Sequence, residues 1–576
     1  MVIPQISKAP KVLFFIGFIF LFVLSCGQDS DLYDELSAYE EVNKEIEDKD
    51  LNSEDEETDE DENTNEDENS DEETNDTAQD TNHPVEGAYY VTANGSASND
   101  GLSEESSWSL QQALSRAGEG DVVYVKAGEY FINRGITTDI SGTMNNPVRI
   151  IGYKDNPGDI QSSNGSTFKY GDEINASDMP MIVGSSYGSG WGITWNGREG
   201  VEIENFIITK FDVAMTWGIS HGKIKNVIAW GLGLQDRQQS GSGNGFRITG
   251  SNNTIENCYA ENIGSVAISL FGGNNTLRHT EVVGSNNNNT TGYFILCSGE
   301  RSTRNEIEYC TISRYTPDND HQGHGFITKD GATYNTFRNS TAHNTGIEAS
   351  YKNSHHNVWE NISITCDADR YRSVFSAGIR LMNGTNNNVF RNIYVENNIS
   401  GIEFRDYDDG SSSDLQRDAQ EGGSDNLFVN IIVNNVERGI WFSDGEGGSN
   451  TSFSNDNTFV NCTFHNVDRF ISAAQNIDNM NIVNCIVDGV GKQMIGTSNG
   501  SFDLSIQNTN FSGTNLAIPQ GRNLTAMEPN FRNPSNRDFR LQGSNLEVGI
   551  APPVDLARTD FNGKTRSAPY NLGAFE

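Results

Sequence analysis

Basic residues are scarce in this chain. Its 576 residues include 39 Lys and Arg against 80 Asp and Glu, which gives a formal net charge of −41. Residues 84–576 alone still hold 54 acidic and 35 basic residues, a net charge of −19. A protein that binds nucleic acid needs a basic surface that displaces counterions from phosphates, and no general surface of that kind is available. We therefore expect no nucleic acid partner.

A hydrophobic run long enough to span a membrane is also missing at the start of the chain. The apolar residues from Val12 to Leu24 follow a short basic stretch, and a run of this length is typical of a secretory signal. The residues Val23-Leu24-Ser25-Cys26 resemble a bacterial lipobox. That resemblance implies that residues 1–25 are removed and that Cys26 becomes a lipid-modified N-terminus. A plain signal peptide with a coincidental cysteine is the alternative.

Large apolar residues are few between residues 26 and 85. Residues 28–83 contain 26 Asp and Glu against two lysines, so too little apolar surface is available to offset the entropy lost on folding. We predict an acidic, disordered stalk over residues 26–85. Acidic residues soon after Cys26 resemble signals that send lipoproteins of some Gram-negative bacteria to the outer face. This implies an outer membrane lipoprotein, exposed at the cell surface and attached to the membrane only through its lipid.

Amphipathic helices are missing between the apolar segments of the remaining chain, which excludes helical solenoids and folds that alternate strands with helices. What recurs instead is Asn-x-apolar-x-Asn followed by a small or aliphatic residue. Clear copies begin at Asn253, Asn335, Asn357, Asn388, Asn426 and Asn457, and degenerate copies lie at Asn275, Asn305 and Met480. Successive copies are 22 to 38 residues apart. Each copy fits one coil of short strands, stacked roughly 4.8 Å from the next.

We therefore predict that residues 86–576 form one all-β domain, a right-handed parallel β-helix (a solenoid), and that the protein is a monomer. Asparagine tolerates left-handed bends and its amide can bond to the next copy, so the repeated asparagines should form ladders. The apolar residue between each pair of asparagines should lie in the core. The cysteines Cys258, Cys310, Cys462 and Cys485 share the next inward column, where buried thiols are expected. Cys462 and Cys485 are the pair most able to form a disulfide.

The ends of the domain carry their own signals, because a solenoid must cover its open core. The amphipathic segment from Ser107 to Ala117 predicts a capping helix before a first strand at Val122 to Val125. Tyr89-Tyr-Val-Thr92 and Asn571-Leu-Gly-Ala-Phe575 resemble sequences that open and close bacterial proteins of the pectate-lyase-like superfamily. The resemblance implies a carbohydrate-active parallel β-helix protein whose C-terminal segment closes the far end. It selects no activity, since that superfamily holds lyases, hydrolases, epimerases and adhesins.

Functional side chains gather on one predicted flank. Five strands align as Phe326–Lys329, Ile347–Ser350, Ile379–Met382, Ile402–Arg405 and Ile440–Ser443. If the first and third residues of each point inward, the second and fourth point outward. The two outward columns are Ile327, Glu348, Arg380, Glu403, Trp441 and Lys329, Ser350, Met382, Arg405, Ser443. We predict a groove for an acidic polysaccharide here, with His324, Tyr351, Lys352, His355 and Asp406 at its edges.

Cleavage by hydrolysis needs two carboxyl groups, one protonated and one ionised. Glu348 and Glu403 lie two coils apart, roughly 9.6 Å between backbones, near the upper end of the range for inverting glycosidases. Arg380 between them would lower both pKa values, which suits a base better than an acid. Asp406 is therefore a rival partner. The alternative is that Glu348, Arg380 and Glu403 form a charge ladder that only lines the sheet. Between the two reactions, we favour a hydrolase over a lyase.

Cleavage by β-elimination needs a cation that neutralises a uronate carboxylate and a base that takes the neighbouring proton. The candidate cations are Lys329, Lys352, Arg380 and Arg405. The candidate bases are His324, Tyr351 and Lys352. His355 and Trp441 complete the predicted substrate-binding set. A glycan-binding or adhesive lipoprotein without activity is the alternative from a different class.

Three short motifs carry weaker signals. Asn196-Gly-Arg-Glu199 resembles the Asn-Gly-x-Glu pattern of alginate lyases of this fold, although Arg198 replaces a small residue and a turn is the alternative. Gly323-His324-Gly325 resembles a motif of polygalacturonases, but the paired aspartates expected upstream are absent. No aspartate quartet like that of pectate lyases is present, so we assign no metal ligand. Asp406-Tyr-Asp408-Asp409-Gly410 offers oxygen ligands that suit Ca²⁺, the one candidate cofactor.

Overall fold

The computed structural model describes residues 86–133, 135–235, 242–285, 291–315, 323–351, 354–367, 377–406, 422–443, 453–497, 501–542, 547–548, 557–567 and 570–575. The chain divides into two units, Met1–Ser70 and Asp71–Glu576, and every described residue belongs to the second. The predicted signal segment, Cys26 and the predicted stalk lie outside the described residues.

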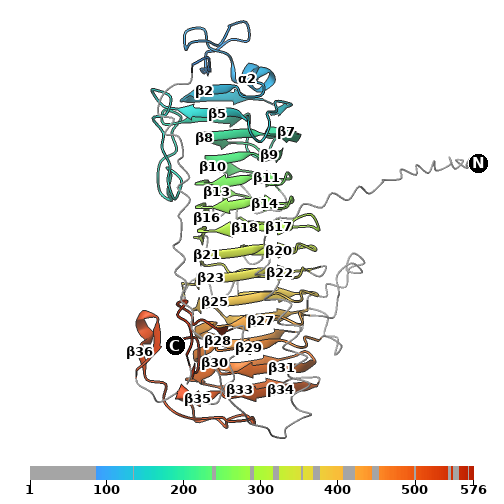
Figure 1. The fold of residues 1–576 in the computed structure, drawn as a ribbon, viewed down its shortest axis with the longest axis vertical. Helices are drawn as coiled ribbons and strands as arrows, with labels where there is room; N and C mark the ends of the chain where they lie inside the picture. The colour runs from blue at the N-terminus through green and yellow to red at the C-terminus, as the bar shows by residue number, and fades with distance from the viewer. Residues whose placement is uncertain are drawn as a thin grey trace, which may run out of the picture. The chain divides into compact units, whose positions relative to one another are not determined.

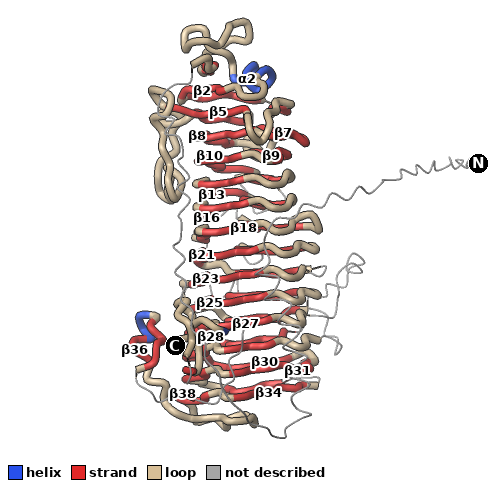
Figure 2. Tube along the Cα trace, viewed as in Figure 1, coloured by secondary structure: helices blue, strands red, loops and turns tan. Residues whose placement is uncertain are grey.

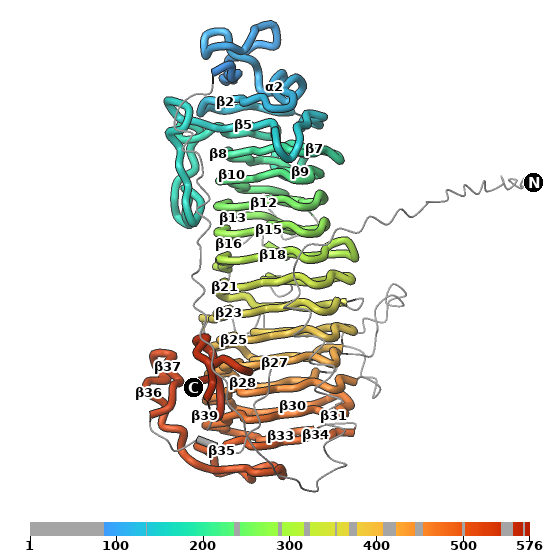
Figure 3. The backbone as a smooth tube through the Cα atoms, viewed as in Figure 1, coloured from blue at the N-terminus to red at the C-terminus, as the bar shows by residue number. Residues whose placement is uncertain are grey.

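The second unit is a right-handed parallel β-helix, as predicted. Short strands from successive coils stack in parallel, and 35 strands of the described residues form one continuous array (Figure 1, Figure 2). Figure 3 follows the backbone coil by coil from β2 to β34. Most coils contribute to three faces, and the longer strands, such as β28 and β30, bend from one face to the next.

The strand pairings define the three faces. The first face contains β1 (Tyr89–Val91), β2 (Val122–Lys126), β5 (Val148–Tyr153), β8 (Val201–Thr209), β10 (Lys223–Leu232), β12 (Thr254–Glu256), β15 (Thr276–Arg278), β18 (Glu306–Glu308), β21 (Thr336–His343), β23 (Val358–Thr365), β25 (Val389–Glu396), β27 (Leu427–Val429), β29 (Thr458–Val460), β31 (Ile477–Val483) and β34 (Phe502–Gln507). The second face adds β3 (Gly128–Ile132), β6 (Pro180–Gly184), β13 (Tyr259–Ile263), β16 (Glu281–Gly284), β19 (Thr311–Arg314), β28 (Ile432–Ser443), β30 (Thr463–Ala473), β32 (Ile486–Asp488) and β35 (Asn510–Ser512).

The third face, which carries the predicted groove, consists of the remaining strands of the array together with the ends of β28 and β30. Its strands are β4 (Ile136–Thr138), β7 (Trp191–Glu199), β9 (Val213–Ser220), β11 (Asn244–Ile248), β14 (Val266–Leu270), β17 (Tyr293–Ser298), β20 (His324–Lys329), β22 (Ile347–Ser350), β24 (Ala377–Met382), β26 (Ser400–Arg405) and β33 (Gln493–Thr497). Outside the array lie α2 (Leu110–Arg116), β36 (Phe531–Asn533), η2 (Pro534–Asn536), β37 (Asp538–Leu541), β38 (Glu547–Val548) and β39 (Tyr570–Asn571).

The first asparagine of each repeat forms a buried amide ladder. The amide oxygen of Asn388 accepts hydrogen bonds from the backbone N–H and the side-chain amide of Asn357, at 3.0 and 3.1 Å. The backbone N–H and the side-chain amide of Asn388 in turn donate hydrogen bonds to the amide oxygen of Asn426, at 3.1 and 3.2 Å. The ladder runs through Asn253, Asn275, Asn305, Asn335, Asn357, Asn388, Asn426 and Asn457. It satisfies buried backbone donors and fixes the register between coils.

The second asparagine of each repeat makes the bend between the first and second faces. Asn361 and Asn392 have φ angles of 53° and 54°, in the left-handed region that asparagine tolerates better than most residues. The degenerate copies keep this conformation with other residues, since His279 and Tyr309 have φ angles of 50° and 52°. The bend therefore recurs even where the asparagine is lost.

The predicted core column is fully buried, and its rings stack. Trp359 lies parallel to its neighbours Phe337 and Phe390, with ring centroids 5.5 and 4.8 Å away, and the stack continues through Phe428 to Phe459. The next column holds Cys258, Cys310, Cys462 and Cys485, all buried free thiols. Cys462 and Cys485 are free thiols and form no disulfide in this structure, and the backbone N–H of Cys462 donates to the Cys485 sulfur at 3.3 Å.

The helix α2 caps the N-terminal end as predicted. The Ser109 hydroxyl accepts a hydrogen bond from the Gln112 N–H, and Leu110 and Leu114 join the central core. The expectation for the C-terminal segment is wrong. Phe575 packs on the second face, because Tyr394 and Ile432 present an apolar surface there. The residues of the C-terminal region that pack against the central core are Leu516 and Leu524, which precede this segment.

The buried ladder and the bend should respond differently to substitution. Asn388→Ala should lower the free energy of unfolding by more than about 2 kcal/mol, because it removes the acceptor of the buried backbone and side-chain N–H groups of Asn357 and the amide donor to the Ser354 carbonyl. Asn392→Gly should cost less than about 1 kcal/mol, because glycine adopts the left-handed bend freely. Urea denaturation of both variants measures the difference, and equal losses would contradict the distinct roles of the two columns.

Candidate functional site

The third face has the register that the sequence predicted. Glu348 pairs with Arg380, Arg380 with Glu403, and Glu403 with Trp441, one coil apart each time. The second outward column runs from Lys329 through Ser350 and Met382 to Arg405 and Ser443. The residues between them on these strands lie in the core. Side chains far apart in the sequence are therefore neighbours on one flank.

A chain of ionic contacts runs through this flank. One oxygen of Glu348 lies 2.6 Å from Nδ1 of His324 and 3.9 Å from the Arg380 guanidinium. Arg380 donates to Glu403 at 2.9 Å, and the Ser443 hydroxyl donates to the other oxygen of Glu403 at 3.0 Å. Glu348 and Glu403 are only 2% and 1% exposed. Both carboxylates are thus held below the surface by protein groups.

The charge state of Glu348 follows from these neighbours. Burial alone would raise the pKa of Glu348, but the charge and hydrogen bond of His324, with Arg380 and Lys329, outweigh it and lower the pKa to about 2. Burial likewise opposes the charge of Arg380, yet Glu403 and Glu348 raise the pKa of its guanidinium. Glu348 is therefore a carboxylate at neutral pH. It is a poor proton donor, but as a hydrogen-bond partner it can hold the His324 ring in position.

A tyrosine that the sequence analysis did not select completes the cluster. The Tyr293 ring stacks on His324, with centroids 4.9 Å apart and planes 14° apart. The Lys329 ammonium donates to the Tyr293 hydroxyl at 3.0 Å and lies 5.1 Å from the centre of the Tyr351 ring. Burial opposes the charge of Lys329, but Tyr293, Asp330 and Glu348 together raise its pKa. Extending the strand alignment by one coil, to Ile295–Ser298, would have placed Tyr293 above His324.

The other predicted site residues are more dispersed. Asp406 is buried where β26 ends, and its backbone N–H bonds to the Ser443 carbonyl at 3.3 Å. Arg405 is half-buried at its predicted position. His355 lies at the turn before β23, with its Nδ1 2.5 Å from that of His356, and burial lowers its pKa. Lys352 and the residues 408–410 of the candidate calcium loop lie outside the described residues.

The Asn-Gly-x-Glu motif is remote from this cluster. Its residues end β7, six pairings along the third face from β22. Gly197 has a φ angle of 60° at an irregularity in the β7 pairing, Arg198 bonds to Asp139, and Glu199 lies 3.3 Å from His221. The motif is an irregular, mostly exposed end of β7 with its own ion pairs.

In the described part of the chain, no group of three or more His, Cys, Asp or Glu side chains could hold a metal ion. No helix within the same residues has the length and apolar character needed to cross a membrane.

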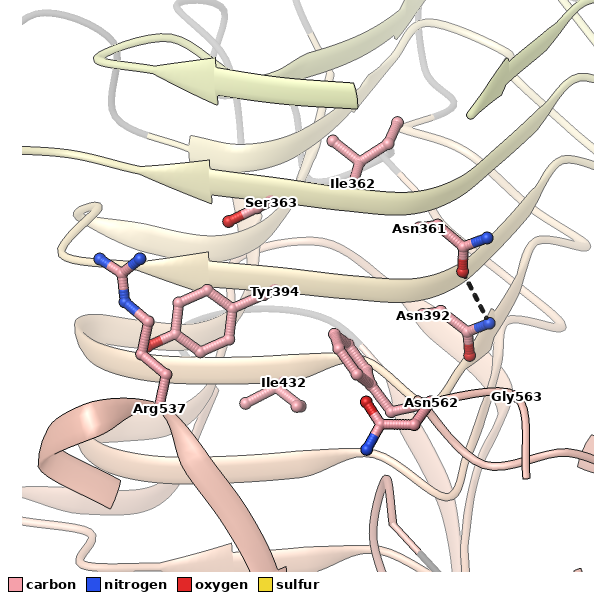
Figure 4. A pocket seen from close by; sticks show the side chains of 10 residues that line it. Asn361, Ile362, Ser363, Asn392, Tyr394, Ile432, Arg537, Asn562 and Gly563 are labelled. Carbon is pink, nitrogen blue, oxygen red and sulfur yellow. Dashed lines mark hydrogen bonds between the residues drawn. The ribbon is translucent and has the colours of Figure 1, made fainter. Parts of the chain in front are cut away.

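A cavity of about 560 Å³ lies apart from the cluster, where the C-terminal segments meet the second face (Figure 4). Figure 4 shows Tyr394 beside Arg537 and the hydrogen bond from Asn392 to Asn361, which is 3.0 Å long. Arg537 pairs with Glu396 at 2.7 Å, so its charge is already neutralised. This cavity does not belong to the candidate site.

The comparisons with known proteins give structural neighbours only. No protein-family model matches the sequence, and no curated protein sequence matches it. The chain is similar to a mannuronic-acid-specific polysaccharide family 6 lyase from human gut microbiota, with TM-score 0.48, 15% identity, and coverage of 74% of this chain and 90% of that one. It is also similar to a PL6 family alginate lyase, with TM-score 0.48, 13% identity, and coverage of 80% and 56%. A GH87 α-1,3-glucanase catalytic domain gives TM-score 0.39, 15% identity, and coverage of 66% and 63%.

The lowered pKa of Glu348 makes a prediction about acid stability. Because the folded pKa of about 2 lies below the ordinary 4.5, ionised Glu348 stabilises the fold above pH 4.5, and this contribution is lost as the pH falls toward 2. Glu348→Gln should therefore lower the free energy of unfolding by about 3 kcal/mol at pH 7, and the deficit should shrink in acid. Chemical denaturation at a series of pH values measures this.

Glu306→Gln is the matched control, because Glu306 is half-exposed and pairs with Arg338 at 3.3 Å on the first face. It should cost less than about 1 kcal/mol at every pH. A deficit in Glu348→Gln that stays constant down to pH 3 would contradict the ionised, stabilising carboxylate.

Proposed function

We propose that this protein depolymerises an acidic polysaccharide by β-elimination at the cluster of Tyr293, His324, Lys329 and Glu348. The observation that carries the proposal is the contact between the buried Glu348 carboxylate and Nδ1 of His324. A carboxylate in that position favours a proton on Nδ1, so Nε2 is the basic nitrogen of the neutral ring. The His324 side chain is 18% exposed, so a substrate can reach it.

Each remaining group has a role in the same reaction. Lys329 neutralises the uronate carboxylate with the N–H groups that do not bond to Tyr293. His324 takes the proton from the carbon beside that carboxylate, and the electron pair forms a double bond as the glycosidic carbon–oxygen bond breaks. Because the Tyr293 oxygen accepts from Lys329, its own proton is directed elsewhere and is delivered to the departing sugar oxygen. Arg405 binds a neighbouring sugar unit, and Trp441 binds a unit farther along the chain.

Hydrolysis by Glu348 and Glu403 has less support in this geometry. Hydrolysis needs one protonated carboxyl group and one that activates water. Glu348 is held ionised, and both carboxylates are buried and engaged with Arg380. The two glutamates and Arg380 serve better as the support that orients His324. Asp406 is likewise buried below the surface.

We also propose that the protein is an outer membrane lipoprotein exposed at the cell surface, and that it acts as a monomer. The support is the lipobox-like sequence ending at Cys26 and the acidic residues that follow it. In Gram-negative cells that make the protein, Cys26→Ala should abolish incorporation of a labelled fatty acid. Labelling that persists in the variant would contradict lipidation at Cys26.

The reaction is tested by the product and by two substitutions. A panel of uronate polysaccharides should yield products with the ultraviolet absorbance of an unsaturated uronate. His324→Gln and Tyr293→Phe should each lower kcat by at least about 100-fold, because each removes a proton-transfer group. His343→Gln is the matched control and should leave kcat unchanged. His343 also pairs with a carboxylate, Asp367 at 3.3 Å, but it lies on β21, outside the third face.

Other outcomes identify other functions. Chain cleavage with new reducing ends but no new absorbance would replace elimination by hydrolysis. Binding of acidic polysaccharides without any cleavage would identify a glycan-binding lipoprotein. Unchanged kcat in both His324→Gln and Tyr293→Phe would place the reaction elsewhere on the chain.

A further inference from the structure

A second cavity continues the candidate site along the third face. It has a volume of about 310 Å³, and we call it the arginine cleft. Its lining residues are Arg438, Trp441, Arg469, Ser472, Ala473, Ala474, Gln493, Gly496 and Thr497. They come from the ends of β28 and β30 and from β33, the strands that follow β26 on this face.

The shape of the cleft follows from the outward column that contains Glu348. After Glu403 this column continues with Trp441, Ser472 and Gly496. Side-chain size therefore decreases from tryptophan to serine to glycine over three coils. The small Ser472 side chain leaves a hollow beside the large Trp441 ring, in line with the cluster of the proposed reaction, and the Gln493 side chain lies over Gly496.

The charge of the cleft is positive. Arg469 lies 2.7 Å and Arg438 lies 3.3 Å from the same oxygen of Glu437. One carboxylate cannot neutralise two guanidinium groups, so one positive charge is left over among the described residues. The two arginine side chains are 32% and 24% exposed, which leaves their remaining N–H groups accessible from the cleft. A planar guanidinium of this kind suits a carboxylate, which it can bind through two parallel hydrogen bonds.

Trp441 adds an orienting contact. The Arg438 guanidinium lies 4.3 Å from the centre of the Trp441 ring, close enough for a cation–π interaction. The ring thus limits the positions of the guanidinium and presents an apolar wall at the same time. An apolar wall beside charged donors matches a sugar ring that carries an anionic group.

We propose that the arginine cleft is a subsite that binds a uronate unit of the polysaccharide several sugars away from the bond that is cleaved. This inference rests on the proposed function for its substrate class. Trp441 lies three coils from Glu348 in the same column, which corresponds to roughly 14 Å. Only an oligosaccharide of several units reaches from the cluster into the cleft, so the subsite acts on long substrates.

The test compares substrate lengths. Arg438→Gln and Arg469→Gln, singly and combined, should raise KM for uronate octasaccharides by at least about tenfold with little change in kcat, since each removes a hydrogen-bonded charge. KM for disaccharides and trisaccharides should not change, because they do not reach the cleft. Arg391→Gln is the matched control, because Arg391 pairs with Glu360 at 2.6 Å on the first face.

Binding measurements separate this inference from the proposed reaction. Calorimetry with the His324→Gln variant and the same uronate octasaccharides needs no cleavage. Arginine-dependent binding supports the subsite even if no elimination is ever observed. Cleavage that shows the same KM in the wild type and the double arginine variant at every length would overturn the subsite and leave the reaction intact. Equal or tighter binding of sulfated, uronate-free octasaccharides would overturn the assignment to a carboxylate.

Discussion

The buried amide ladder is the interaction on which the rest of this structure depends. Each asparagine of the ladder fixes both the backbone and the side chain of the same position one coil away. A shift of one residue in any coil would break these bonds and turn core residues outward. The register of the third face follows from this constraint. Glu348, Arg380 and Glu403 face the same way because the asparagines at the start of their coils are aligned.

The sequence was sufficient to predict the fold because its signals are periodic. The repeated asparagines and the single apolar residue between them reveal a stack, and the structure confirms the core column from Ile255 to Ile482. The capping helix was also predictable, since Ser109 and the leucines after it form a local pattern. The C-terminal segment was not predictable in the same way. Its packing depends on an apolar surface that Tyr394 and Ile432 create only after the coils are stacked.

The sequence predicted which residues lie together in the candidate site better than it predicted the role of each residue. The alignment of strands identified Glu348, Arg380, Glu403 and Lys329 as neighbours, but it gave no information on burial. The depth of the two glutamates makes them supports rather than surface acids. Tyr293 was missed because the strand alignment began one coil later, at Phe326. Side-chain stacking across coils, which joins it to His324, has no signature in the sequence alone.

The uneven length of the repeats has a consequence for how such a protein can change. Successive asparagines of the ladder are 22 to 38 residues apart, yet their hydrogen bonds keep nearly the same length. Extra residues are therefore absorbed outside the ladder, at low entropic cost for each added residue. Insertions and deletions at these places can reshape the walls around the third face while the scaffold stays unaltered, so new specificities can arise without a new fold.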